Sequence, residues 1–212
     1  MSQEKSLKEA FVASPKQFSL STELLSAQQK TTMLQGYETQ IDVFNTTSAK
    51  LDVADKSTAT CLGGEYRDLS FDFISNMNGI YLSQLYFANI SDPNSQLAMD
   101  SLSYMRLTRD FGTFDEWQKD FIATCMSSCD GWGLTVFSNY LQRYINVTLD
   151  NDSVGIPVGC YPIIVINASP RAYSRDYLNN KKAYITNMMR EFNWRIIEKR
   201  FIKAENMLKV SK

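Results

Sequence analysis

The stretch Pro162–Phe201, PIIVINASPRAYSRDYLNNKKAYITNMMREFNWRIIEKRF, carries the features that decide the fold of this chain. It opens with the apolar, β-branched run 163–166, which is short enough to be a buried strand. The polar residues 167–170 then supply a turn, and two segments with helical periodicity follow. The order predicts a strand that passes through a tight turn into a pair of helices.

The rest of the chain predicts an α+β fold with a polar lead at 1–17, a helical-hairpin domain at 18–92 and a C-terminal α+β domain at 93–212. Thr113 and Glu116 form a capping box that opens a helix. The expected helices are 18–44, 66–90, 96–108, 114–129, 171–179, 181–192 and 194–210, with a polar loop at 46–64. The expected strands are 134–140, 144–149 and 158–166, and they form a three-stranded antiparallel sheet.

These segments resemble the iron/manganese superoxide dismutase family. In that family a strand ends in D-V-W-E-H-A-Y-Y-x-D-Y, and a later helix carries N-W-x-x-V-x-K-R. The matching residues of this chain are Ala172-Tyr173, Asp176-Tyr177, Asn193-Trp194 and Glu198-Lys199-Arg200, with earlier matches at 20–25, 111–114 and 131–132. The resemblance spans residues 18–201 and implies the dismutase fold.

The residues that the family uses to bind its metal are replaced here. The resemblance implies Asn167 in place of the metal-binding aspartate, and Arg171 and Ser83 in place of two histidines. The third histidine falls on Ala27 or Gln28, because the match is one residue short there. These residue types are poor ligands for iron or manganese, and the chain contains no histidine at all. We therefore expect no metal or other cofactor and no enzymatic activity.

Composition sets further bounds. With 212 residues, of which 44% are hydrophobic, the chain can build one sizeable core or two small domains. It has no run of about 18 apolar residues, so no membrane association is expected. Its first residues do not resemble a targeting signal, so we expect that either no such signal exists or it has been removed from the numbering. Residues 171–212 hold 11 basic and 4 acidic residues, a net charge of +7, whereas the rest of the chain carries −8. This asymmetry fits either a surface that faces a polyanion or a solvated helical face.

The four cysteines, at 61, 125, 129 and 160, have no disulfide or zinc-ribbon spacing, which indicates a reducing compartment. They are expected to be mostly buried thiols that pack as small apolar groups. Cys125 and Cys129 stand one helical turn apart, so an enzyme with a cysteine-bound metal is a further alternative.

The resemblance extends to metal-free members of the family that occur as a pair in the small subunit of mitochondrial ribosomes. It implies a non-catalytic structural subunit in the mitochondrial matrix that pairs with a second dismutase-like chain and contacts ribosomal RNA and neighbouring proteins. Candidate RNA or protein contacts are Lys181, Lys182, Arg190, Arg195, Lys199, Arg200 and Lys203.

Superoxide dismutases pair next to the E-H-A-Y-Y segment, so the candidate pairing residues are Pro170, Arg171, Tyr173 and Ser174. The alternative from another class is a free-standing, catalytically inactive dismutase-like dimer that acts as a binding module.

Overall fold

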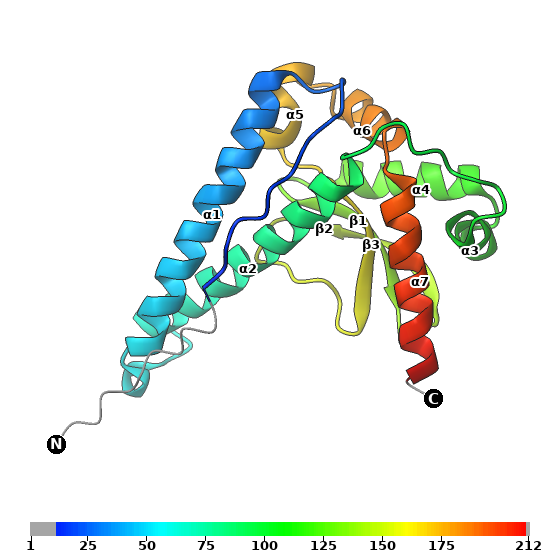
Figure 1. Cartoon of the computed structure of the whole chain (residues 1–212). Helices are drawn as coiled ribbons and strands as arrows, with labels where there is room; N and C mark the ends of the chain where they lie inside the picture. Colours follow the sequence, from blue (N-terminus) through cyan, green and yellow to red (C-terminus); the bar gives the residue numbers. More distant parts are fainter. Residues whose placement is uncertain (1–11, 211–212) are drawn as a thin grey trace.

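The computed structural model describes residues 12–210, which form a long helical hairpin and an α/β part around a small sheet (Figure 1). The hairpin consists of α1 (Ala27–Val53) and α2 (Glu65–Asn89), which pack side by side, with the 3-10 turn η2 (Lys56–Thr58) in their connection. α2 begins after Gly63 and Gly64, whose φ angles of 120° and 128° favour glycine. The predicted second helix at 66–90 is confirmed to within one residue at each end.

The first helix begins later than the sequence predicts. Its N-cap is Ser26, whose hydroxyl accepts a hydrogen bond from the Gln29 N–H at 3.1 Å. Residues 18–25 are not helical, and side chains from far along the chain bond the main chain at the end of this segment. The Tyr177 hydroxyl donates to the Leu24 carbonyl at 2.8 Å, and the Asp176 carboxylate accepts a hydrogen bond from the Ser26 N–H at 2.7 Å. Residues 1–11 of the predicted polar lead lie outside the described residues.

The first helix also ends later than predicted, at Val53 rather than 44. The polar residues that suggested a loop are accommodated within the helix. The Thr46 hydroxyl donates to the Asp42 carbonyl four residues earlier, and Thr47 is buried. Polar composition therefore misplaced this boundary.

The sheet is three-stranded and antiparallel, which confirms the predicted fold class. Its strands are β1 (Trp132–Ser138), β2 (Arg143–Leu149) and β3 (Cys160–Asn167), in the order β2-β1-β3. Every residue of the central strand β1 is buried. The predicted first strand ran on to Tyr140, but that residue lies in the β1–β2 turn and is 91% exposed.

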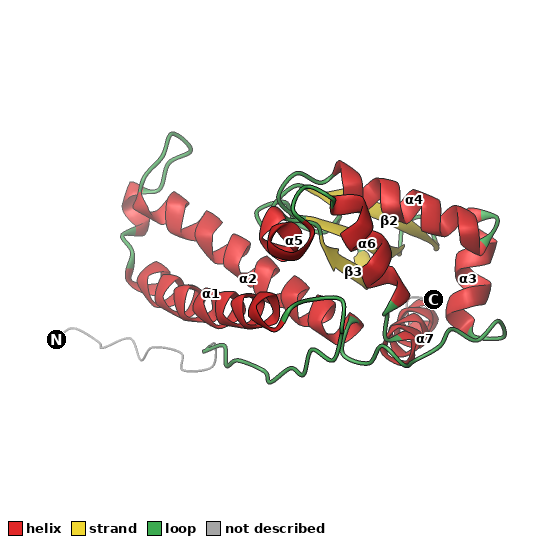
Figure 2. Ribbon diagram, turned by 90° about the horizontal axis from the view of Figure 1, so that it is seen from above, coloured by secondary structure: helices red, strands yellow, loops and turns green. Residues whose placement is uncertain are grey.

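Five further helices enclose the sheet (Figure 2): α3 (Leu102–Phe111), α4 (Phe114–Ser127), α5 (Pro170–Tyr177), α6 (Lys181–Arg190) and α7 (Trp194–Val210). α4 contacts β1 and β2, whereas α2 and α7 contact β3. The N-cap half of the predicted capping box is confirmed, since the Thr113 hydroxyl accepts a hydrogen bond from the Glu116 N–H, whereas the Glu116 carboxylate accepts one from the Lys119 ammonium at 2.7 Å. The helix predicted at 96–108 begins only at Leu102, after its N-cap Ser101. The predicted domain boundary at residue 92 falls in the loop before α3.

The core beneath α4 is aromatic. Trp117 has no exposed surface; its ring centroid lies 5.6 Å from that of Phe121 and 6.0 Å from that of Trp194, and its indole N–H donates to the Thr135 hydroxyl at 3.0 Å. Burial of large rings of this kind contributes strongly to the stability of the domain. Among residues 12–210, no helix combines the length and apolar character that a membrane span requires.

Candidate functional site

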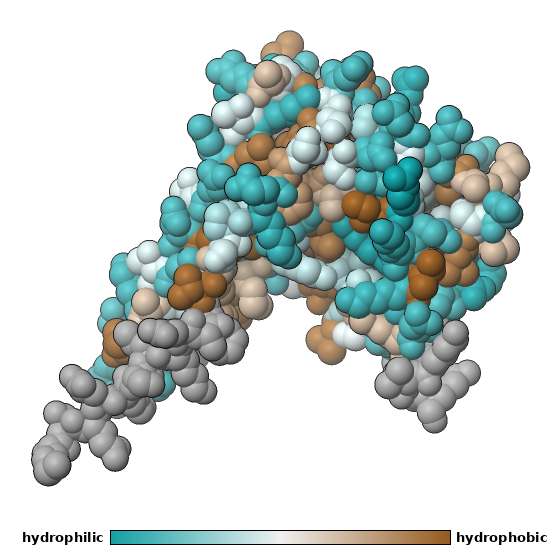
Figure 3. Space-filling view, viewed as in Figure 1, coloured by the Kyte–Doolittle hydropathy of each residue, from teal (hydrophilic) through white to brown (hydrophobic). Residues whose placement is uncertain are grey.

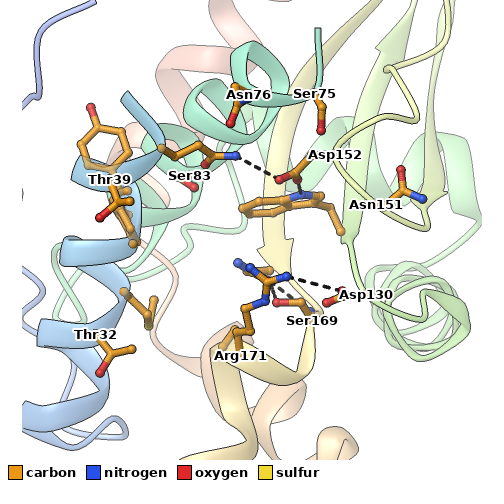
Figure 4. A pocket seen from close by; sticks show the side chains of 18 of the residues that line it. Thr32, Thr39, Ser75, Asn76, Ser83, Asp130, Asn151, Asp152, Ser169 and Arg171 are labelled. Carbon is orange, nitrogen blue, oxygen red and sulfur yellow. Dashed lines mark hydrogen bonds and ion pairs between the residues drawn. The ribbon is translucent and has the colours of Figure 1, made fainter. Parts of the chain in front are cut away.

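A cavity of about 600 Å³ lies where the hairpin meets the sheet (Figure 4). Side chains from α1 and α2 form one wall, and β1, the end of β3, α5 and the loop 150–153 form the other. Its lining is mainly neutral and hydrogen-bonding, with serine, threonine, asparagine and glutamine side chains around Trp132 and Phe87.

Three of the four positions predicted from the resemblance meet in this cavity: Ser83 from α2, Asn167 from the end of β3, and Arg171 from α5. The fourth, Gln28, does not line it and is exposed on α1, as is the alternative Ala27. The side chain that turns inward is that of Gln29, which is 1% exposed and whose amide donates to the Arg171 carbonyl at 2.7 Å. Gln28 thus lies away from the cavity, because the phase of α1 against α5 turns the neighbouring Gln29 inward; which residue of α1 corresponds to the third ligand stays a prediction.

Asn167 is committed to the local structure. Its side-chain oxygen accepts hydrogen bonds from the N–H and the hydroxyl of Ser169 at 3.0 and 2.7 Å, an Asx turn that leads into α5. Its carbonyl accepts a hydrogen bond from the Tyr184 hydroxyl at 2.9 Å. The residue therefore joins the end of β3 to both α5 and α6.

A pair of buried tyrosines lies behind Asn167. The hydroxyls of Tyr86 on α2 and Tyr184 on α6 are 2.8 Å apart, and neither residue has exposed surface. Burial raises the pKa of both phenols well above the ordinary value. At Tyr86 the hydrogen bond with Tyr184 lowers the pKa and so opposes part of this effect. Both are therefore protonated near neutral pH and act as hydrogen-bonding groups.

The loop 150–153 is fastened across the cavity by Asp152. Its carboxylate accepts hydrogen bonds from the Trp132 indole at 2.6 Å and from the Gln40 amide at 3.2 Å. Gly79 on α2 leaves room for this contact, because a Cβ there would overlap the ends of the Gln40 and Asp152 side chains, and these would have to move. The Arg171 side chain, by contrast, is 89% exposed at the opening and comes only within 3.9 Å of Asp130.

The family of the chain follows from its relatives. Residues 101–200 match the model for the C-terminal domain of iron/manganese superoxide dismutases. Over 169 residues, 80% of this chain and 78% of the relative, the sequence is 30% identical to an iron superoxide dismutase of Aquifex pyrophilus. The chain belongs to the iron/manganese superoxide dismutase family. An iron superoxide dismutase of Aquifex aeolicus is 29% identical over the same coverage, and manganese superoxide dismutase 1 of Halobacterium salinarum is 26% identical over 70% of this chain and 69% of its own.

The family corrects one prediction. These relatives are named as superoxide dismutases, so membership indicates an enzyme, and the expectation that the chain is not one is contradicted. That expectation came from the substituted ligand positions and from the absence of histidine in the sequence. Substitutions at a few positions do not remove a chain from an enzyme family.

The residues of the cavity nonetheless do not fit the iron or manganese of the family. Ser83 offers a hydroxyl, Arg171 a cation, and the Asn167 oxygen already accepts two hydrogen bonds. Within residues 12–210, no group of three or more His, Cys, Asp or Glu side chains is placed to hold a metal ion. Transition metals prefer imidazole, thiolate and carboxylate donors, so no reaction step through a metal can be derived from this set.

Two of the predicted surface cations are buried, which corrects their assignment as RNA or protein contacts. Lys181 is 8% exposed, its ammonium donates to the Ser128 carbonyl, and burial lowers its pKa. Arg200 is also 8% exposed, and burial lowers its pKa to about 10. Helical spacing could have revealed Arg200, because it lies on the same face of α7 as Ile197, Phe201 and Ala204, all buried.

The other five predicted contacts, Lys182, Arg190, Arg195, Lys199 and Lys203, are exposed on α6 and α7. Of the predicted pairing residues, Pro170, Arg171 and Ser174 are exposed, whereas Tyr173 is half-buried and its ring lies 5.5 Å from that of Tyr184. Their role in pairing stays a prediction.

The cysteines differ from the expectation of mostly buried thiols. Cys125 is buried against Gly133, where a Cβ would overlap its sulfur, but Cys61 and Cys129 are exposed and Cys160 is half-buried. Among the described residues, no third His, Cys, Asp or Glu side chain is placed to bind a metal together with Cys125 and Cys129, so the structure offers no support for an enzyme with a cysteine-bound metal.

Proposed function

We propose that this member of the superoxide dismutase family serves as a subunit of the mitochondrial small ribosomal subunit, with a metal-free cavity, and pairs there with a second dismutase-like chain. The observation that carries the proposal is the charge distribution on α7. Arg195, Lys199 and Lys203 are all exposed and spaced four residues apart, so they form a basic ridge about 12 Å long on one face of the helix. In Figure 3, hydrophilic side chains cover most of the part of the surface formed by α7.

The acidic residues of α7 do not neutralise this basic ridge. The Glu198 carboxylate accepts hydrogen bonds from the backbone N–H groups of Leu102 and Ser103 at the start of α3. Glu205 pairs with Arg106 through two hydrogen bonds of 2.8 and 2.9 Å. The three cations of the ridge form no ion pair within residues 12–210. A row of unpaired cations on a rigid helix suits the phosphate backbone of RNA.

Sedimentation tests the ribosomal assignment. The tagged chain should co-migrate with small ribosomal subunits when mitochondrial extracts are fractionated at moderate salt. A neutralised ridge, Arg195→Gln with Lys199→Gln and Lys203→Gln, should weaken that association and make it more sensitive to salt. The matched control is Lys30→Gln with Lys50→Gln and Lys119→Gln, which removes three positive charges from α1 and α4. A chain found only as a free dimer would overturn the proposal and favour the free-standing binding module.

Metal analysis tests the second half of the proposal. The purified chain should carry far less than one iron or manganese per molecule. The variant Gln29→His with Ser83→His, Asn167→Asp and Arg171→His should acquire metal, because it restores three imidazoles and a carboxylate at the cavity. Stoichiometric iron or manganese in the unmodified chain would refute a metal-free cavity and leave the ribosomal assignment to be judged by sedimentation.

A further inference from the structure

A second surface lies where α2, β3 and α7 meet, away from the cavity. Figure 1 shows α2 and α7 diverging on either side of β3. Tyr81 of α2 is 43% exposed and Tyr161 of β3 is half-buried. The ammonium of Lys203, the last member of the basic ridge, lies 5.3 Å from the centre of the Tyr161 ring. We call Tyr81, Tyr161 and Lys203, with Arg200 buried beneath them, the tyrosine–arginine surface.

Arg200 places a positive charge beneath this surface that no carboxylate balances. Its guanidinium donates to the Asn89 side-chain oxygen at 2.6 Å and to the carbonyls of Ile163 and Leu85 at 2.8 and 3.0 Å. All three acceptors are neutral, and Arg200 forms no ion pair in the described part of the chain. A buried charge that is hydrogen-bonded but not neutralised leaves a local field that attracts anions.

Besides burial, the charges of Arg200 and Lys203 and the phenol of Tyr161 all influence the pKa of Tyr81. Burial chiefly raises the pKa of Tyr81, and the neighbouring Tyr161 raises it further, whereas the charges of Arg200 and Lys203 lower it. The phenol of Tyr81 therefore lies within electrostatic reach of the other three residues. Within residues 12–210 neither tyrosine hydroxyl has a hydrogen-bond partner, and neither is fully buried.

We propose that the tyrosine–arginine surface binds single-stranded RNA. A base would stack on an exposed tyrosine ring while the adjoining phosphates contact Lys203 and continue along the basic ridge toward Arg195. Stacking on aromatic side chains combined with backbone contacts to cations is how proteins hold unpaired nucleotides. A duplex hides its bases and would use the ridge without the rings. This inference rests on the proposed function and specifies the form of RNA that the chain recognises.

The experiment measures binding of a fluorescein-labelled twelve-nucleotide oligouridylate to the purified chain by fluorescence anisotropy over a series of KCl concentrations. Tyr81→Leu should weaken binding about tenfold, because one base loses its stacking platform. Lys203→Gln should reduce the slope of log Kd against log salt by about 0.7, the loss of one phosphate contact. The matched controls are Tyr140→Leu, which removes a tyrosine that is 91% exposed in the β1–β2 turn, and Lys119→Gln, both of which should leave Kd unchanged.

Two results would overturn the inference: Tyr81→Leu binding as tightly as Tyr140→Leu, or an RNA duplex of the same length binding as tightly as the single strand. A photo-crosslinking residue placed at position 81 in the assembled particle gives an independent answer. Labelled RNA supports the inference, and labelled protein alone refutes it. Because anisotropy uses the isolated chain, a negative result there leaves sedimentation with the ribosome unaffected. RNA binding without co-sedimentation would instead contradict only the proposed function.

Discussion

The cavity and the aromatic core share the strand β1, yet they are built from opposite kinds of contact. Trp132, at the start of β1, turns its indole N–H to Asp152 in the cavity wall. Thr135, three residues on, accepts the indole N–H of Trp117 in the core. Polar side chains and an exposed arginine line the cavity, whereas closely packed rings fill the core, and those of Trp117 and Phe121 have no exposed surface.

The comparison shows that fold and site depend on separate parts of the molecule. The dismutase fold is retained where apolar rings pack under α4, because packing alone sets the positions of the elements there. The ligand positions are substituted at the cavity, where polar side chains are held by hydrogen bonds and the Arg171 side chain is exposed. The residues of the polar cavity can therefore change with little loss of stability, whereas those of the aromatic core cannot. The following variants test this difference in stability between the cavity and the core.

Trp117→Ala should have the largest effect, a loss of about 3–5 kcal/mol in the free energy of unfolding, since it leaves a large cavity in the core. Urea denaturation followed by circular dichroism measures it. Leu62→Ala is the control, because Leu62 is 94% exposed and should change stability by less than about 0.5 kcal/mol. Equal losses for both variants would contradict the role given to the aromatic core.

Arg200→Met should cost about 2 kcal/mol. The substitution removes the donor that the Asn89 side-chain oxygen and the Ile163 and Leu85 carbonyls share, and relief from burying the charge offsets part of that loss. Lys199→Met, the exposed neighbouring position, should be nearly neutral. If both variants unfolded at the same urea concentration, Arg200 would not join α2, β3 and α7 as described.

Tyr184→Phe should cost about 1 kcal/mol at neutral pH, because the Tyr86 hydroxyl and the Asn167 carbonyl lose a hydrogen bond. The pH dependence is a second signature. The raised pKa values of Tyr86 and Tyr184 give stability that is complete below about pH 10 and is lost above it, where the unfolded tyrosines ionise.

Between about pH 9.5 and about pH 11, the range around the pKa of unfolded tyrosine, the free energy of unfolding of the Tyr184→Phe variant should therefore fall less steeply with pH than that of the unmodified chain. Tyr140→Phe, at an exposed position, should keep the unmodified slope. If the Tyr184→Phe variant kept the slope of the unmodified chain, the phenol of Tyr184 in the unmodified chain would ionise as freely in the folded state as in the unfolded state.

Arg171→Ala should have the smallest effect, indistinguishable from zero in urea denaturation. Its side chain is exposed and Asp130 is 3.9 Å away, so the pair adds little. Gln29→Ala is the informative partner, because Gln29 is buried and bonds the main chain of Arg171, and it should cost about 1 kcal/mol. A large loss for Arg171→Ala would show that this charge is structural.

The sequence by itself determined the order of helices and strands and the α4 cap at Thr113. Apolar periodicity and local hydrogen bonds are properties of short segments, so these features can be predicted from the residues alone. The expectation that Ser83, Asn167 and Arg171 share one site came instead from the resemblance to the dismutase family, because the three residues lie far apart in the chain. Only the tertiary structure decided that Gln29 rather than Gln28 turns inward, that Lys181 and Arg200 are buried, and that residues 18–25 are not helical. Each of these depends on which face of a helix packs against a neighbour or on hydrogen bonds from residues far along the chain, and local pattern carries no record of either.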